Sequence, residues 1–140
     1  MIPKQRARLI AAWALGLCLA QLFVRTGWGK FGGDPSWTAA FAEWGYAAWF
    51  RILVGVVELA AGIALVIPWT ASYGALALCL VMMGAWSTLA HDLRWKDMAV
   101  VAGYGLGLGW IASEWWWLRL RLRRPPELEH RIRQVGGWPR

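Results

Sequence analysis

The acidic side chain of Glu58 stands alone in an apolar stretch of the sequence, with Val57 and Leu59 as its neighbours and no charge from Leu59 to Ala90. A charged group in the hydrocarbon of a membrane costs roughly 3 kcal/mol on insertion scales, so such a carboxylate needs a partner or a proton. Arg25, near the end of the first apolar run, is the expected partner because its long stem can reach inward.

Two interpretations of this pair remain open. In the first, Glu58 and Arg25 form a buried ion pair or hydrogen-bonded network that fixes helix packing. In the second, they line a polar cavity, open to the outer side, that binds a headgroup, a quinone or a proton. Gln21 belongs to the same candidate site because it lies one helical turn from Arg25 on the same face.

Further polar residues collect near the same end of the expected helices. Lys30 follows the first apolar run, and Tyr104 has a depth in the last helix close to that of Glu58. His91, beside Asp92, could relay protons at neutral pH, although a solvated helix end explains it as well. The candidate catalytic residues are therefore Glu58 and His91, and the candidate ligand-binding residues are Arg25, Lys30, Gln21 and Tyr104.

The composition requires a membrane. The chain has 140 residues, of which 59% are hydrophobic, more apolar surface than one small soluble core can bury. A spanning helix needs about 20 apolar residues, and the turn at 68–70 divides the longest uncharged run into two such helices. We therefore predict an all-α integral membrane four-helix bundle in residues 1–118, with spans near 8–28, 48–67, 71–92 and 97–118.

Basic residues predict the orientation of this bundle. They cluster before the first span and in the segment 119–140, which we interpret as a basic cytoplasmic tail. Under the positive-inside rule both termini lie in the cytoplasm, as in a multi-pass protein of the bacterial inner membrane. The natural counter-charge of the tail is the anionic inner leaflet, so we expect the lipid bilayer and no nucleic acid as its partner.

The sequence excludes several kinds of redox site. The two histidines, His91 and His130, fall on opposite membrane faces, and there is no Cys/His cluster for a metal. Cys18 and Cys79 are single residues on different helices and form no C-x-x-C motif. We expect no intrinsic cofactor and no metal site, so any redox centre would belong to a partner.

Two segments are expected to contact the bundle or its surroundings. The last span has glycines four residues apart, namely Gly103 with Gly107 and Gly105 with Gly109. Such glycines allow another helix to approach closely, and we favour a helix of the same chain. Residues 35–46 carry aromatic side chains at helical spacing and predict a short amphipathic segment on the outer surface. This segment is either a lipid anchor or a lid over Glu58.

Several short motifs in a fixed order resemble the DoxX-like four-helix membrane proteins, over roughly residues 7–109. They are Arg25, Gly27 and Lys30 after the first span; the segment 41–50; the run 55–62 around Glu58; and the segment 83–91 that ends at His91. The basic tail and the many tryptophans depart from the family pattern.

The resemblance implies an accessory subunit of a quinone-linked redox complex, since the family is associated with thiosulfate:quinone oxidoreductases and other membrane oxidoreductases. On this hypothesis a quinone binds near Glu58, Arg25 and His91, with Lys30 at its head group, and a membrane protein partner or a second copy completes the assembly. The alternative hypothesis is a non-catalytic assembly or scaffold subunit of a larger membrane complex.

Overall fold

The computed structural model describes residues 3–122, and within them every regular element is a helix. The basic tail predicted at 119–140 lies outside the described residues, except that the last helix continues to Leu122. The elements are α1 (Pro3–Trp28), the π-helical turn η1 (Gly29–Gly33), α2 (Pro35–Glu43), α3 (Ala48–Val66), α4 (Ala71–His91) and α5 (Trp95–Leu122). The all-α membrane bundle is thus confirmed, with α2 as an additional short helix.

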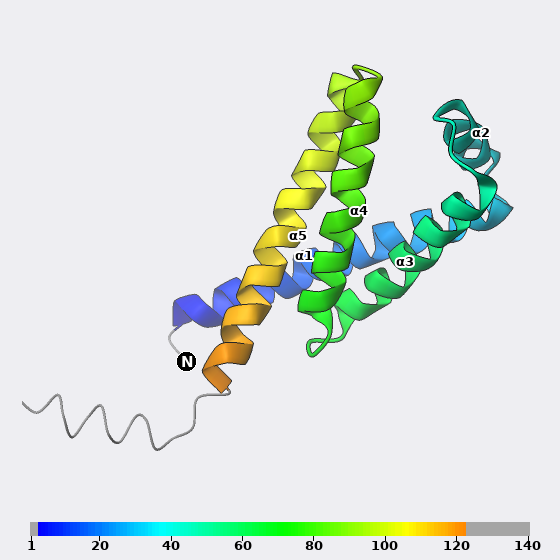
Figure 1. The fold of residues 1–140 in the computed structure, drawn as a ribbon. Coiled ribbons are helices and arrows are strands. Elements are labelled where there is room, and N and C mark those ends of the chain that lie inside the picture. The colour runs from blue at the N-terminus through cyan, green and yellow to red at the C-terminus, as the bar shows by residue number, and fades with distance from the viewer. Residues whose placement is uncertain (1–2, 123–140) are drawn as a thin grey trace, which may run out of the picture.

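The long helices form two antiparallel pairs that cross each other (Figure 1). α1 packs mainly against α3, and α4 mainly against α5, while α3 and α4 join the two pairs. A core of Leu19, Leu65, Leu78, Leu108 and Ile111 lies where the pairs cross. The α4–α5 pair then diverges from α3, and α2 lies beside the resulting space (Figure 1).

Glycines set the closest helix contacts, but they are not the ones expected from the sequence. A Cβ atom on Gly74 of α4 would lie 2.7 Å from the carbonyl oxygen of Ala61 in α3, so the two backbones touch. In α5, by contrast, a Cβ atom on Gly103 or Gly109 would meet nothing within 4 Å. A Cβ atom on Gly107, however, would lie 3.5 and 3.7 Å from the side chains of Leu15 and Leu19 in α1. The expected internal packing therefore holds for part of this glycine series and not for Gly103 and Gly109.

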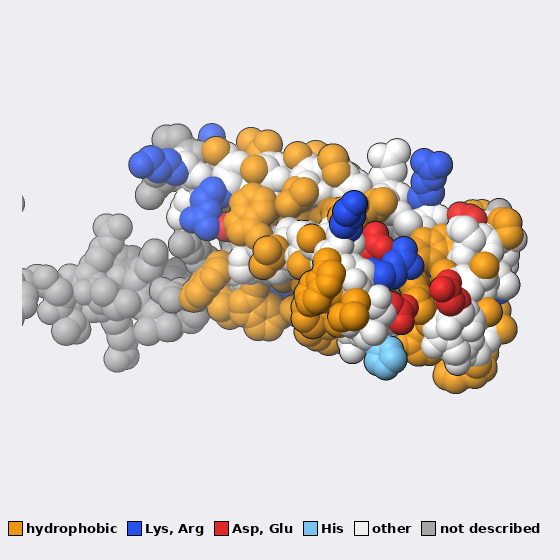
Figure 2. All heavy atoms as spheres, turned by 90° about the horizontal axis from the view of Figure 1, so that it is seen from above, with side chains coloured by type: hydrophobic (Ala, Val, Ile, Leu, Met, Phe, Trp, Pro, Cys, Tyr) orange, Lys and Arg blue, Asp and Glu red, His pale blue; other side chains and the backbone are white. Residues whose placement is uncertain are grey.

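The surface of the bundle is that of a membrane protein. Within residues 3–122, three helices are long and apolar enough to span a bilayer, namely Lys4–Gly32, Ala48–Val66 and Ala71–His91. Large apolar side chains point outward along them, and hydrophobic atoms cover much of the face shown in Figure 2. Exposed apolar area on this scale marks contact with lipid. α5 is not among the three helices, since glycine and tryptophan dilute its charge-free part, and its span at 97–118 stays a prediction.

Candidate functional site

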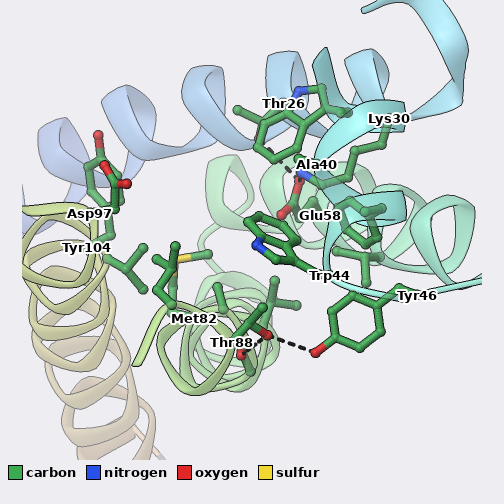
Figure 3. A pocket seen from close by; sticks show the side chains of 18 of the residues that line it. Thr26, Lys30, Ala40, Trp44, Tyr46, Glu58, Met82, Thr88, Asp97 and Tyr104 are labelled. Atoms are coloured by element: carbon green, nitrogen blue, oxygen red, sulfur yellow. Dashed lines mark hydrogen bonds and ion pairs between the residues drawn. The ribbon is translucent and has the colours of Figure 1, made fainter. Parts of the chain in front are cut away.

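A cavity of about 570 Å³ lies between the two helix pairs, at the end of the bundle where α2 packs (Figure 3). Side chains from all six helical elements line it, α1 included, and most of them are aromatic or aliphatic. Its few polar groups include the ammonium of Lys30 and the carboxylate of Glu58. Apolar walls with a small number of polar groups are typical of small-molecule pockets of roughly 300–1,000 Å³.

Glu58 is buried at the wall of this cavity and is bound through one of its two carboxylate oxygens. Its Oε2 atom accepts a hydrogen bond from Lys30 Nζ at 2.6 Å and another from Thr26 Oγ1 at 3.2 Å. The side chains of Lys30 and Glu58 are only 3% and 5% exposed. The prediction that Glu58 needs a partner inside the bundle is met by a salt bridge, but the partner is Lys30.

The expected pairing of Glu58 with Arg25 is wrong, and helix geometry gives the reason. Phe23, Gly27 and Lys30 follow each other at intervals of four and three residues, so they share the face of the first helix that meets α3. Arg25 lies on the opposite face and is exposed. Lys30 continues this face because η1 prolongs the helical path beyond Trp28.

Besides the salt bridge, two contacts fix the position of Lys30. Arg51 of α3 donates a hydrogen bond to the backbone carbonyl of Lys30. The ammonium lies 3.7 Å from the centre of the Trp37 ring, a distance at which the negative face of the indole attracts a cation. The turn then kinks at Gly32, whose φ of 115° is a conformation that favours glycine. Lys30 is therefore held between Glu58 and Trp37.

α2 begins with a side-chain cap. Asp34 accepts a hydrogen bond from the backbone N–H of Ser36 at 2.9 Å, and Pro35 occupies the first helical position. Hydrogen bonds from Ser36 lower the pKa of the exposed Asp34 carboxyl. The cap fixes where α2 starts, directly after the turn that carries Lys30.

Aromatic residues of α2 face the cavity. The ring of Phe41 is buried and lies within 6.5 Å of the rings of Trp37, Trp44, Tyr46 and Phe50. All five of these residues line the cavity. α2 therefore covers one side of the cavity, as expected for a lid, while the contact of the segment 35–46 with lipid stays a prediction.

The lid is also tied to α4. Gly45, with φ of 74°, ends α2, and the N–H of Tyr46 donates to the carbonyl of Phe41 at 2.9 Å, as in a Schellman motif. This turn directs Tyr46 toward α4, where its hydroxyl lies 2.8 Å from the hydroxyl of Thr88 (Figure 3). The hydrogen bond connects the α2–α3 junction to the opposite wall of the cavity.

The predicted site residues divide into two groups. Lys30, Glu58 and Tyr104 line the cavity, and Tyr104 packs edge-on against Phe23. Gln21 and Arg25 are exposed on the far face of α1, and the His91 side chain is 93% exposed at the end of α4. None of these last three lines the cavity, so the expected grouping of Arg25 and His91 around Glu58 is wrong.

Sequence reasoning missed several contributors to the site, namely Thr26, Arg51, Trp44 and Thr88. Thr26 lies four residues before Lys30, and the two share a helix face only because the helical path continues through η1. Thr88 had none, whereas the helical spacing of the aromatic side chains in 35–46 already placed Trp44 in the possible lid. A tryptophan near a membrane interface usually anchors its helix in the headgroup region. A threonine near the end of a span carries no functional signal of its own.

The fold and the cavity together define a multi-pass α-helical membrane protein with a lidded pocket built around a buried ion pair. The DoxX-like family matches residues 8–112, three quarters of the chain, and the chain belongs to this family. Comparison with curated proteins and with solved structures gives no match.

Proposed function

We propose that this chain is an accessory subunit of a quinone-linked redox complex in the bacterial inner membrane and that its cavity binds a quinone or a similar amphiphile. The observation that carries the proposal is the buried Lys30–Glu58 pair in the wall of a 570 Å³ cavity with aromatic sides. Flat aromatic walls suit a ring, and the ion pair lies beside the space that the ring would take.

The residues on the cavity wall suit binding and proton exchange. Reduction of a quinone consumes protons, and an ammonium and a carboxylate 2.6 Å apart can pass a proton to a neighbouring oxygen. His91 is outside the cavity, so we assign this exchange to Lys30 and Glu58. Electrons would come from the partner protein, since the chain is proposed to carry no redox centre of its own.

The membrane orientation expected from the positive-inside rule fits the same proposal. With both termini in the cytoplasm, the cavity and its α2 lid would lie toward the outer side of the membrane. A quinone in the bilayer would then reach the site from the lipid around the bundle, and a partner complex would meet it at the outer surface.

The proposal is tested by isolating the protein in polymer-bounded native membrane discs, without detergent, and measuring extracted quinone per protein. Ala85 lines the cavity on α4, so Ala85→Phe fills part of the space. Ala102→Phe adds the same ring on the exposed side of α5 and is the matched control. Discs with the wild type or Ala102→Phe should contain more quinone than their lipid alone accounts for. Discs with Ala85→Phe should not. Equal quinone in all three would overturn the proposal.

The scaffold function remains the second candidate, favoured by α5. Positions 103 and 109 on this helix face open space, where another transmembrane helix could approach its backbone. The same native discs separate the two candidate functions. The scaffold function would be favoured if no sample contains quinone and Ala85→Phe still retains a large partner protein.

A further inference from the structure

The cavity has a hydrogen-bond donor with no partner. The Nε1 atom of Trp44 is shielded from solvent and makes no hydrogen bond with any residue in 3–122. A buried N–H without a partner is destabilising, and such groups are rare in folded proteins. Trp44 lies in the cavity wall, and its nitrogen edge is turned toward the side of Met82 (Figure 3).

The charges around the cavity are already balanced. The charged side chains among its described lining residues form two ion pairs, Lys30 with Glu58 at 2.6 Å and Arg94 with Asp97 at 2.7 Å. A charged ligand would have to leave water without a free counter-charge to receive it, which is costly in an apolar site. A neutral ligand avoids this cost.

We infer that the cavity selects uncharged amphiphiles that carry an acceptor oxygen, and that the Trp44 N–H donates the hydrogen bond that holds this oxygen. The inference rests on the proposed function and narrows its ligand class to neutral acceptors such as a quinone carbonyl. A small rotation of the indole brings its N–H to an oxygen in the adjoining space. Lys30 and Glu58 remain paired with each other while the neutral head group is bound.

Trp44→Phe is the direct variant because it removes the N–H and keeps an aromatic ring in the lid. Trp69→Phe is the matched control, since the Trp69 side chain is 74% exposed in the α3–α4 turn and does not line the cavity. Thermal unfolding of the three proteins in lipid nanodiscs first establishes that they fold equally well.

The experiment measures uptake of radiolabelled decylubiquinone by loaded nanodiscs, after subtraction of empty ones. Wild type and Trp69→Phe should bind with the same Kd, and Trp44→Phe about tenfold more weakly, because one buried hydrogen bond is lost. Decanoate and decyltrimethylammonium, which share the chain but carry a charge, should bind the wild type at least about tenfold more weakly than decylubiquinone.

An infrared measurement separates the hydrogen bond from packing. With ¹³C-carbonyl quinone, the bound carbonyl stretch should fall below its frequency in lipid for the wild type and return to that frequency in Trp44→Phe. Equal Kd values and equal frequencies for these two proteins would overturn the assignment to Trp44 while the proposed function stands. Tighter binding of either charged probe would overturn the selection for neutral ligands, and absence of quinone binding by the wild type would overturn the proposed function and this inference together.

Discussion

Gly27 of α1 and Gly55 of α3 are in reciprocal backbone contact: a Cβ atom on Gly27 would lie 2.8 Å from the carbonyl oxygen of Gly55, and one on Gly55 would lie 2.9 Å from that of Gly27. Only glycine permits this approach. Lys30 and Glu58 each follow their glycine by three residues, so the contact between the helices brings the two charged side chains together.

Replacing Gly27 with alanine should therefore destabilise the bundle by about 1–3 kcal/mol, because the new methyl group meets backbone atoms that cannot move aside. The free energy of unfolding in bicelles measures the effect. Gly103→Ala is the control, since its methyl group would meet nothing within 4 Å. Equal stability of the two variants would show that the α1–α3 contact is looser than described.

Removing only one partner of the buried ion pair should be more damaging than removing both. Glu58→Leu leaves the Lys30 ammonium buried without its carboxylate, which we expect to cost about 3–5 kcal/mol of unfolding free energy. The double variant Lys30→Met with Glu58→Leu should recover most of this loss, since apolar side chains of similar size replace the pair. A double variant no more stable than the single one would argue against the salt bridge.

The cap of α2 should weaken in acid. The pKa of Asp34 is lowered in the folded state, so its carboxylate stabilises α2 above the usual aspartate pKa, and this contribution is lost as the pH falls through the lowered value. Backbone amide exchange in residues 36–40, corrected for its intrinsic pH dependence, should become less protected on acidification. In Asp34→Ala protection should be low throughout and nearly independent of pH. An identical pH profile in wild type and variant would contradict the assigned cap.

The hydrogen bond between Tyr46 and Thr88 should slow the opening of the lid. Tyr46→Phe removes the hydroxyl that bridges the two walls at 2.8 Å, so amide exchange at residues 41–47 should be faster by about two- to tenfold. Tyr73→Phe, at an exposed position on α4 that does not line the cavity, is the matched control. Unchanged exchange in Tyr46→Phe would show that the bond does not restrain α2.

Much of the fold was predictable because membrane helices depend on long apolar runs. The expected spans at 48–67 and 71–92 agree with α3 (Ala48–Val66) and α4 (Ala71–His91) to within one residue. The turn at 68–70 ends one helix and begins the next, as the proline and threonine there indicate. These features are local, and local sequence determines them.

The partner of Glu58 was not predictable in the same way. The sequence indicates a helix end near Trp28, which places Lys30 in a loop and leaves Arg25 as the nearest cation. The structure instead continues through η1, and the close contact at Gly27 shows which face meets α3. The choice between the two cations thus depends on a tertiary contact, as does the inward position of Trp44.

The central claim, that the cavity receives a ligand, is tested most directly by NMR of the protein labelled with ¹³C at the methionine methyl groups. Met82 lines the cavity, Met83 beside it is exposed on the outer surface, and Met98 is buried but does not line the cavity. On titration with decylubiquinone in nanodiscs, the Met82 signal should shift and saturate while the Met98 signal stays, and Ala85→Phe should abolish the saturable shift. The account would be contradicted if the Met82 signal does not shift, or if it shifts only in proportion to the signal of the exposed Met83.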